Sequence, residues 1–116
     1  MTIQTKIICR LQVEGLHCWA NCDIEEVMFL KNSHRHQFHI IATKIVTHAD
    51  RDIEFIRLSH EIKNYLNKQY YSEVADCLQF DSRSCEMLAL ELLEAFNLSS
   101  CEVNEDLEGG SIVERI

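Results

Sequence analysis

Three histidines occur where two strands of the chain could direct them at one metal ion. His17 follows a long segment of alternating residues, and His34 and His36 open a second such segment. Side chains at positions i and i+2 of a strand point to the same face, so His34 and His36 lie on one side of the sheet. Three neutral imidazoles with a fourth position left open form the ligand set of a catalytic zinc site rather than a closed structural one. The spacing therefore predicts a zinc site with these three histidines as ligands.

The elements that must position these histidines are two long strands. Apolar and polar residues alternate from residue 3 to residue 14, with Ile8 the one exception, which predicts a half-buried strand that Gly15 ends. Residues 34–48 form a second strand, for which we expect antiparallel pairing with the first. Residues 16–33 have no clean period, and we interpret them as a functional loop that carries His17 at its start.

Two helices and two further strands follow. The first helix is predicted to begin at residues 50–52 and to reach residue 66, and a mixed connection follows over residues 68–80. Cap candidates at residues 81–84 precede the second helix, which ends near Asn97. Strands are expected over residues 101–105 and 111–116, joined by a turn that contains the hairpin signal Gly109-Gly110. The order β-β-α-α-β-β predicts an α+β fold, an antiparallel four-stranded sheet with two helices on one face.

The length and the composition are those of one globular domain, residues 1–116, with 47% hydrophobic and 26% charged residues. A net charge of −8 argues against binding to nucleic acid and to anionic membranes. No apolar run approaches the roughly 20 residues that span a bilayer, and residues 1–6 lack the apolar core of a signal peptide. We therefore expect a cytoplasmic protein with reduced cysteines. Two helices would cover only one face of the predicted sheet. The other face and the sheet edges would need cover, which favours a homo-oligomer.

Five short segments carry a family resemblance. Residues 13–17 are similar to an F-x-A-A-H segment, residues 34–36 to H-G-H, and residues 53–58 to an aspartate-phenylalanine segment that opens a helix, with Glu54 for aspartate. Residues 84–89 are similar to T-x-E-x-x-A, and the strand that ends in Glu105 and Asp106 is similar to an E-T or E-S segment. In this order and spacing the segments resemble the 6-pyruvoyl-tetrahydropterin synthase and 6-carboxytetrahydropterin synthase family over nearly the whole chain.

The resemblance implies a fold, a cofactor and partners. The family has the tunnelling fold, in which β-β-α-α-β-β subunits close into barrels, so a homo-oligomer such as a tetramer or hexamer is expected. His17, His34 and His36 would be the Zn²⁺ ligands. Glu105 would accept hydrogen bonds from the N–H groups of a pterin- or purine-like ring, and Glu54 is a second candidate ligand-binding residue.

Two departures from the family pattern leave the activity open. The family's catalytic cysteine lies just upstream of H-G-H, where residues 29–33 hold none, and Cys22 is the candidate substitute. The family's second catalytic histidine lies between the helices, where residues 66–83 contain no histidine. If the chain is an enzyme, it is a zinc-dependent lyase acting on dihydroneopterin triphosphate. The alternative is a catalytically inactive oligomer that sequesters or senses a nucleotide-like molecule; a third is a protein-contact module with structural histidines.

Overall fold

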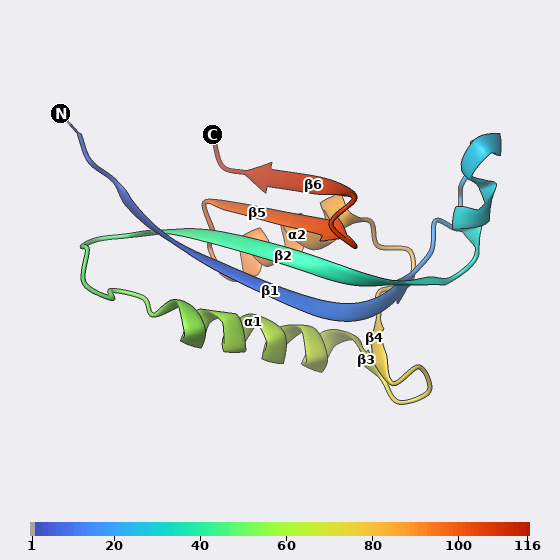
Figure 1. Cartoon of the computed structure of the whole chain (residues 1–116), viewed down its shortest axis with the longest axis horizontal. Coiled ribbons are helices and arrows are strands. Elements are labelled where there is room, and N and C mark those ends of the chain that lie inside the picture. The colour runs from blue at the N-terminus through green and yellow to red at the C-terminus, as the bar shows by residue number, and fades with distance from the viewer. Residues whose placement is uncertain (1) are drawn as a thin grey trace.

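Two long antiparallel strands form the centre of the fold. The computed structural model describes residues 2–116, and in it β1 (Thr5–His17) pairs with β2 (His34–Val46) along its whole length (Figure 1). The pairing begins with Thr5 opposite Val46 and ends with His17 opposite His34. The predicted antiparallel pairing is confirmed, and β1 continues past Gly15, where the sequence predicted its end.

The sheet has six strands rather than the four that the sequence predicted. The added strands are β3 (Tyr71–Ser72) and β4 (Cys77–Gln79), and the order across the sheet is β3-β4-β1-β2-β5-β6. The last two strands are β5 (Ser100–Glu105) and β6 (Gly109–Glu114). Because β4 runs parallel to β1, the sheet is mixed, and the expectation of a purely antiparallel sheet was wrong. Strands of two and three residues are too short to show alternation, so the sequence pattern could not reveal them.

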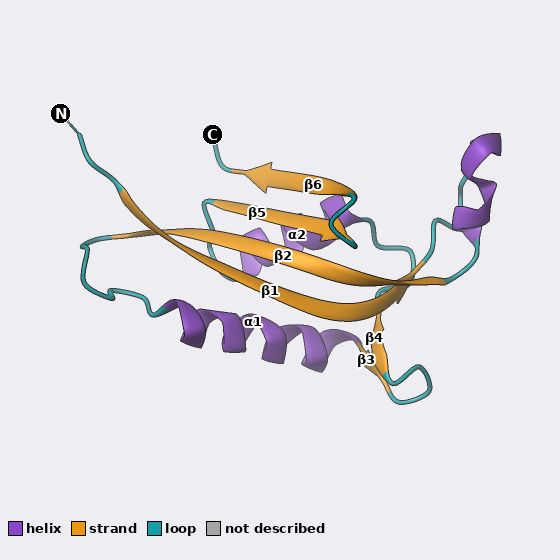
Figure 2. Ribbon diagram, in the orientation of Figure 1, coloured by secondary structure: helices purple, strands orange, loops and turns teal. Residues whose placement is uncertain are grey.

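Both α-helices lie on one face of this sheet, as predicted for an α+β fold (Figure 2). Helix α1 (Phe55–Tyr70) packs against β1, and α2 (Cys85–Ala95) packs against β5 and β6. The buried residues of α1 recur every four positions and form one stripe: Leu58, Ile62, Leu66 and Tyr70. These residues meet the inward side chains of the central strands, and together they form the hydrophobic core.

Helix α1 begins later than the acidic cluster at residues 50–52 suggested. The Glu54 carboxylate is its N-cap and accepts hydrogen bonds from the backbone N–H groups of Ile56 and Arg57. The Asp52 carboxylate instead accepts from the backbone N–H and the hydroxyl of Thr47, which closes the turn after β2. The cluster therefore makes a turn rather than the first turn of the helix.

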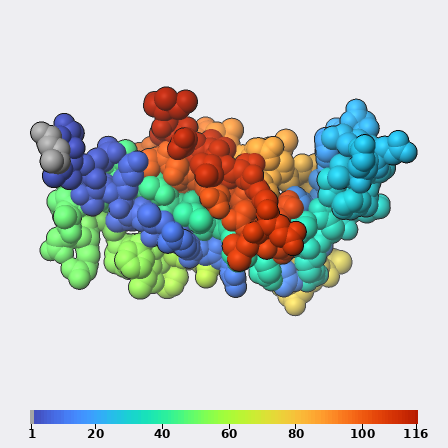
Figure 3. Space-filling view, turned by 45° about the horizontal axis from the view of Figure 1, so that its top comes forward, coloured from blue at the N-terminus to red at the C-terminus, as the bar shows by residue number. Residues whose placement is uncertain are grey.

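The segment between β1 and β2 extends beyond the ends of the strands. It contains a 3-10 helix, η1 (Glu25–Lys31), and Figure 3 shows this part of the chain as a protruding lobe. A backbone hydrogen bond from Trp19 N–H to the Leu30 carbonyl closes the base of the lobe. The loop predicted for residues 16–33 is thus partly helical.

The sheet of one chain is open, with β3 at one edge and β6 at the other. No closed barrel is formed by residues 2–116 alone. Within these residues, no helix combines the length and the apolar character needed to cross a lipid bilayer.

Candidate metal centre

The three predicted histidines meet at one end of the central strand pair. His17 is paired with His34, and His36 lies opposite Gly15. A Cβ at Gly15 would lie 2.5 Å from the nearest Phe80 ring atom and 3.1 Å from Phe38. Glycine is therefore needed here for close packing of these rings beside His36, and it does not end the strand.

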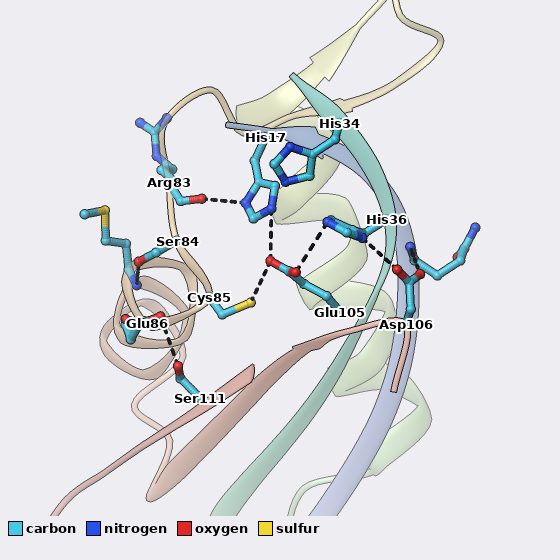
Figure 4. A network of polar contacts seen from close by, with 12 residues as sticks. His17, His34, His36, Arg83, Ser84, Cys85, Glu86, Glu105, Asp106 and Ser111 are labelled. Atoms are coloured by element: carbon cyan, nitrogen blue, oxygen red, sulfur yellow. Dashed lines mark hydrogen bonds and ion pairs between the residues drawn. The ribbon is translucent and has the colours of Figure 1, made fainter. Parts of the chain in front are cut away.

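The imidazoles lie close enough to share one ion. One nitrogen from each ring lies within 4.8 Å of the other two, and the ring centroids are 4.7–5.3 Å apart. Figure 4 shows the three rings gathered beside Glu105, and each pair of rings meets edge to face. The predicted cluster of His17, His34 and His36 is thus brought together, and it could hold a metal ion.

Each imidazole is oriented through its Nδ1 atom. His17 Nδ1 lies 2.9 Å from the Arg83 carbonyl oxygen, and His34 Nδ1 lies 2.8 Å from the carbonyl oxygen of Asn32. Carbonyl oxygens only accept, so each of these Nδ1 atoms donates, and the lone pair of the neutral ring is on Nε2. This tautomer presents Nε2 to a metal, and such outer partners are typical of metal-binding histidines.

The Asp106 carboxylate supports the third histidine, His36. Its Oδ2 accepts a hydrogen bond from His36 Nδ1 at 2.6 Å, and its Oδ1 accepts one from the backbone N–H of Gln37 at 2.9 Å. The Gln37 N–H bond lowers the pKa of Asp106 most, followed by the bond from His36, so the carboxylate is held in its charged form. A carboxylate behind a histidine raises the basicity of that ligand.

The free ring nitrogens fit a metal ion. The Nε2 atoms of His34 and His36 are buried and have no hydrogen-bond partner in the described chain. Buried polar atoms without a partner are costly, and a metal would satisfy both. Imidazole nitrogens suit zinc and other transition metals of similar size. The donor set therefore fits the predicted cofactor.

Glu105 lies beside two of the three histidines. Its Oε1 is 2.9 Å from His17 Nε2, its Oε2 is 3.3 Å from His36 Nε2, and it accepts a hydrogen bond from the Cys85 thiol. The bond from His17 lowers the pKa of Glu105 more than burial raises it. Burial lowers the pKa of His17, but the bonds to Glu105 and to the Arg83 carbonyl raise it by more.

A cavity of about 480 Å³ opens beside the histidines. Its lining includes His17, His34 and Glu105, together with Cys18, Cys85 and Glu86. The segment after β4 builds one wall with residues 82–84, because the parallel pairing of β4 with β1 brings this segment next to His17. A cavity of this size can take a small ring-containing ligand.

Two predicted site residues lie elsewhere. Glu54 is the cap of α1 and is not among the residues that line this cavity. Cys22 is buried below η1, where its thiol donates to the carbonyl oxygens of Ile24 and Val27, and it does not line the cavity either. Arg35, which replaces the glycine of H-G-H, points to the opposite sheet face and pairs with Glu14 there.

The sequence interpretation missed Asp106 and Cys85 as neighbours of the site. Asp106 was part of the family-like E-T segment, and its position after Glu105 was the available signal. Cys85 is buried in the core, and its thiol donates a hydrogen bond to Glu105. Burial, followed by the charge of Glu105, raises the pKa of Cys85 to about 12, so this thiol stays protonated at neutral pH.

No protein-family model matches the chain, and a search of curated proteins found no significant match.

Proposed function

We propose that the chain is a zinc-binding protein similar to 6-pyruvoyl-tetrahydropterin synthase, which binds a pterin- or purine-like ring in the cavity beside the metal. One observation carries the proposal: three imidazoles converge with their Nδ1 atoms already bonded to acceptors, and two of them, His17 and His34, line a cavity of about 480 Å³. The motif resemblance supports the ring chemistry, and the β-β-α-α-β-β order of the longer elements agrees with a tunnelling fold.

The proposal includes a homo-oligomer, a tetramer or hexamer in which the sheets join into a barrel. Two features of the chain support assembly. The sheet has free edges at β3 and β6, and open edges favour pairing with another copy. The sheet face opposite the helices also exposes large apolar side chains, with Ile8 46%, Ile45 48% and Ile112 61% exposed. A ring site at the subunit interface would then take lining residues from two chains.

If the protein is an enzyme, it is a lyase acting on dihydroneopterin triphosphate. Bound zinc would supply Lewis-acid polarisation of a ligand oxygen. Cys22 remains the candidate nucleophile, which would require η1 to open because the thiol is buried and bonded to carbonyl oxygens.

The thiols favour the second candidate, an inactive protein that sequesters or senses a nucleotide-like molecule. Cys22 is outside the cavity, and Cys85 is kept protonated by burial and Glu105. Without a thiolate from Cys22 or Cys85, and with no histidine between the helices, the protein would lose the contribution of about 10²–10⁴-fold that acid–base catalysis usually makes.

Binding and turnover can be separated by one experiment. The purified protein is titrated with zinc, and the zinc-loaded form is then assayed by calorimetry with dihydroneopterin triphosphate and with guanosine triphosphate. Binding with product formation supports the lyase, and binding without product supports the sequestering protein. Zinc binding without either ligand would contradict the ring-binding proposal, and absence of zinc binding would contradict the metal site.

A further inference from the structure

The Glu105 carboxylate lies where a further ligand of the metal would lie. It comes from the last residue of β5 and points between the imidazoles of His17 and His36 (Figure 4). The two carboxylate oxygens lie 2.9 Å and 3.3 Å from the Nε2 atoms of these rings. Two ligand atoms on one tetrahedral zinc ion, with bonds of about 2.0–2.1 Å, are about 3.3 Å apart. Glu105 is therefore at ligand-to-ligand distance from two of the three histidines.

The hydrogen-bonding roles of the rings provide a second, independent argument. His17 Nδ1 donates to the Arg83 carbonyl, so its Nε2 can approach the Glu105 carboxylate, which only accepts, either with a second proton on the ring or with a metal ion between the two atoms. The same choice arises at His36, where Nδ1 donates to Asp106 and Nε2 lies beside Glu105. One metal ion shared by the two nitrogens and the carboxylate satisfies both contacts without placing two charged imidazoles side by side.

We propose that Glu105 is the fourth protein ligand of the metal, so that His17, His34, His36 and Glu105 close the centre when no small molecule is bound. A site with four protein ligands is typical of closed zinc centres, in contrast to the open position that three histidines alone would leave. The inference rests on the metal site of the proposed function.

The assignment gives Glu105 two competing roles. When a ring-containing ligand binds and its N–H groups donate to Glu105, the carboxylate must leave the metal. Because Glu105 also lines the cavity, it is reachable from the space where such a ring would lie. Ligand binding and metal coordination are then coupled through one side chain.

Metal-binding measurements on carboxylate variants test the assignment. Zinc affinity is measured by competition with a chelator, and Co²⁺ is used as a probe whose visible absorption reports coordination number and ligand type. Glu105→Gln removes the charge, whereas Glu105→Asp keeps the charge but withdraws it by one carbon. Glu86→Gln is the matched control, because Glu86 lines the same cavity and bonds to Ser111 rather than to a histidine.

We expect both Glu105 variants to lose zinc affinity by at least about tenfold, with an altered Co²⁺ spectrum, while Glu86→Gln keeps the wild-type values. Melting of the metal-free proteins shows that each variant is folded. Wild-type spectra and affinities in both Glu105 variants would overturn the assignment and leave an open three-histidine site. Loss in Glu105→Gln alone would overturn it too, because charge rather than ligation would then explain the effect. A wild-type protein that binds no metal would overturn the proposed function as well.

Discussion

Replacing Asp106 with asparagine tests whether the carboxylate behind His36 tunes a metal ligand. Asp106 has φ 55°, in the left-handed region, and asparagine tolerates this conformation better than most residues. The amide oxygen can still accept from the Gln37 N–H, but the amide nitrogen then faces His36 Nδ1 and donates. The ring would have to carry its proton on Nε2, so it could no longer bind the metal through Nε2.

The expected loss follows from this geometry. Removal of an outer partner of a metal-binding histidine costs about 10–100-fold in metal affinity, or about 1.4–2.7 kcal/mol. At a fixed saturating zinc concentration, the zinc-linked stability falls by the same amount. In a domain of this size, each kcal/mol lowers Tm by about 4–8 °C. The stability of the metal-free protein should change by less than about 0.5 kcal/mol, because the Asp106 side chain is exposed and the turn is kept.

Chelator competition gives the affinity, and thermal melts with and without zinc give the stabilities. Asp76→Asn is the control, because Asp76 also has a left-handed backbone, φ 53°, but bonds to the Tyr71 hydroxyl. An Asp106→Asn protein with wild-type zinc affinity would refute the claim that Asp106 prepares His36 for a metal. An equal loss in Asp76→Asn would refute it as well.

Two further predictions concern the scaffold. Gly15→Ala should destabilise the protein by about 1–3 kcal/mol, because the new Cβ would collide with Phe80; Gly109→Ala, whose Cβ meets nothing within 4 Å, should stay within about 0.5 kcal/mol in urea unfolding. The second prediction concerns stability at alkaline pH. Burial and the hydrogen bond to Glu91 raise the pKa of Tyr65 from 10.0 to about 12 and raise the pKa of Tyr70 further. Because the folded state holds these protons more tightly, stability is unaffected below about pH 10 and falls as the pH rises toward 12. The loss should shrink when both tyrosines are replaced by phenylalanine, and an unchanged pH profile would contradict this origin.

The histidine cluster could be predicted because it depends on local rules. Alternation identified both long strands, and the i, i+2 spacing placed His34 and His36 on one face. Antiparallel pairing of neighbouring strands then placed His17 opposite His34. Each step needed only the pattern of one segment or the pairing of adjacent segments.

The outer partners of the histidines could not be predicted, because they come from distant segments. Asp106 reaches His36 through the pairing of β2 with β5, and the Arg83 carbonyl reaches His17 through the short parallel β4. Neither short parallel pairing nor the exact end of β5 leaves a periodic signal. Cys22 likewise lies outside the cavity because its thiol is bonded to carbonyl oxygens at η1, and residues 16–33 have no clean period that would indicate this helix.

The turn before β6 lies within the range that the sequence predicted, residues 106–110, but its glycine pair does not form the turn itself. The left-handed residues are Asp106 and Leu107, and both Gly109 and Gly110 lie in β6. Gly110 is needed for close approach, because a Cβ there would lie 2.1 Å from the Val103 carbonyl oxygen. A glycine pair does not by itself distinguish a turn conformation from a crowded strand.

The most direct test of the account is native mass spectrometry of the untagged protein, repeated after denaturation, for wild type and His34→Ala. The account predicts an oligomer that carries one zinc ion per chain in the wild type and none in the variant. A metal-free wild-type protein, or a variant that keeps stoichiometric zinc, would contradict the three-histidine centre.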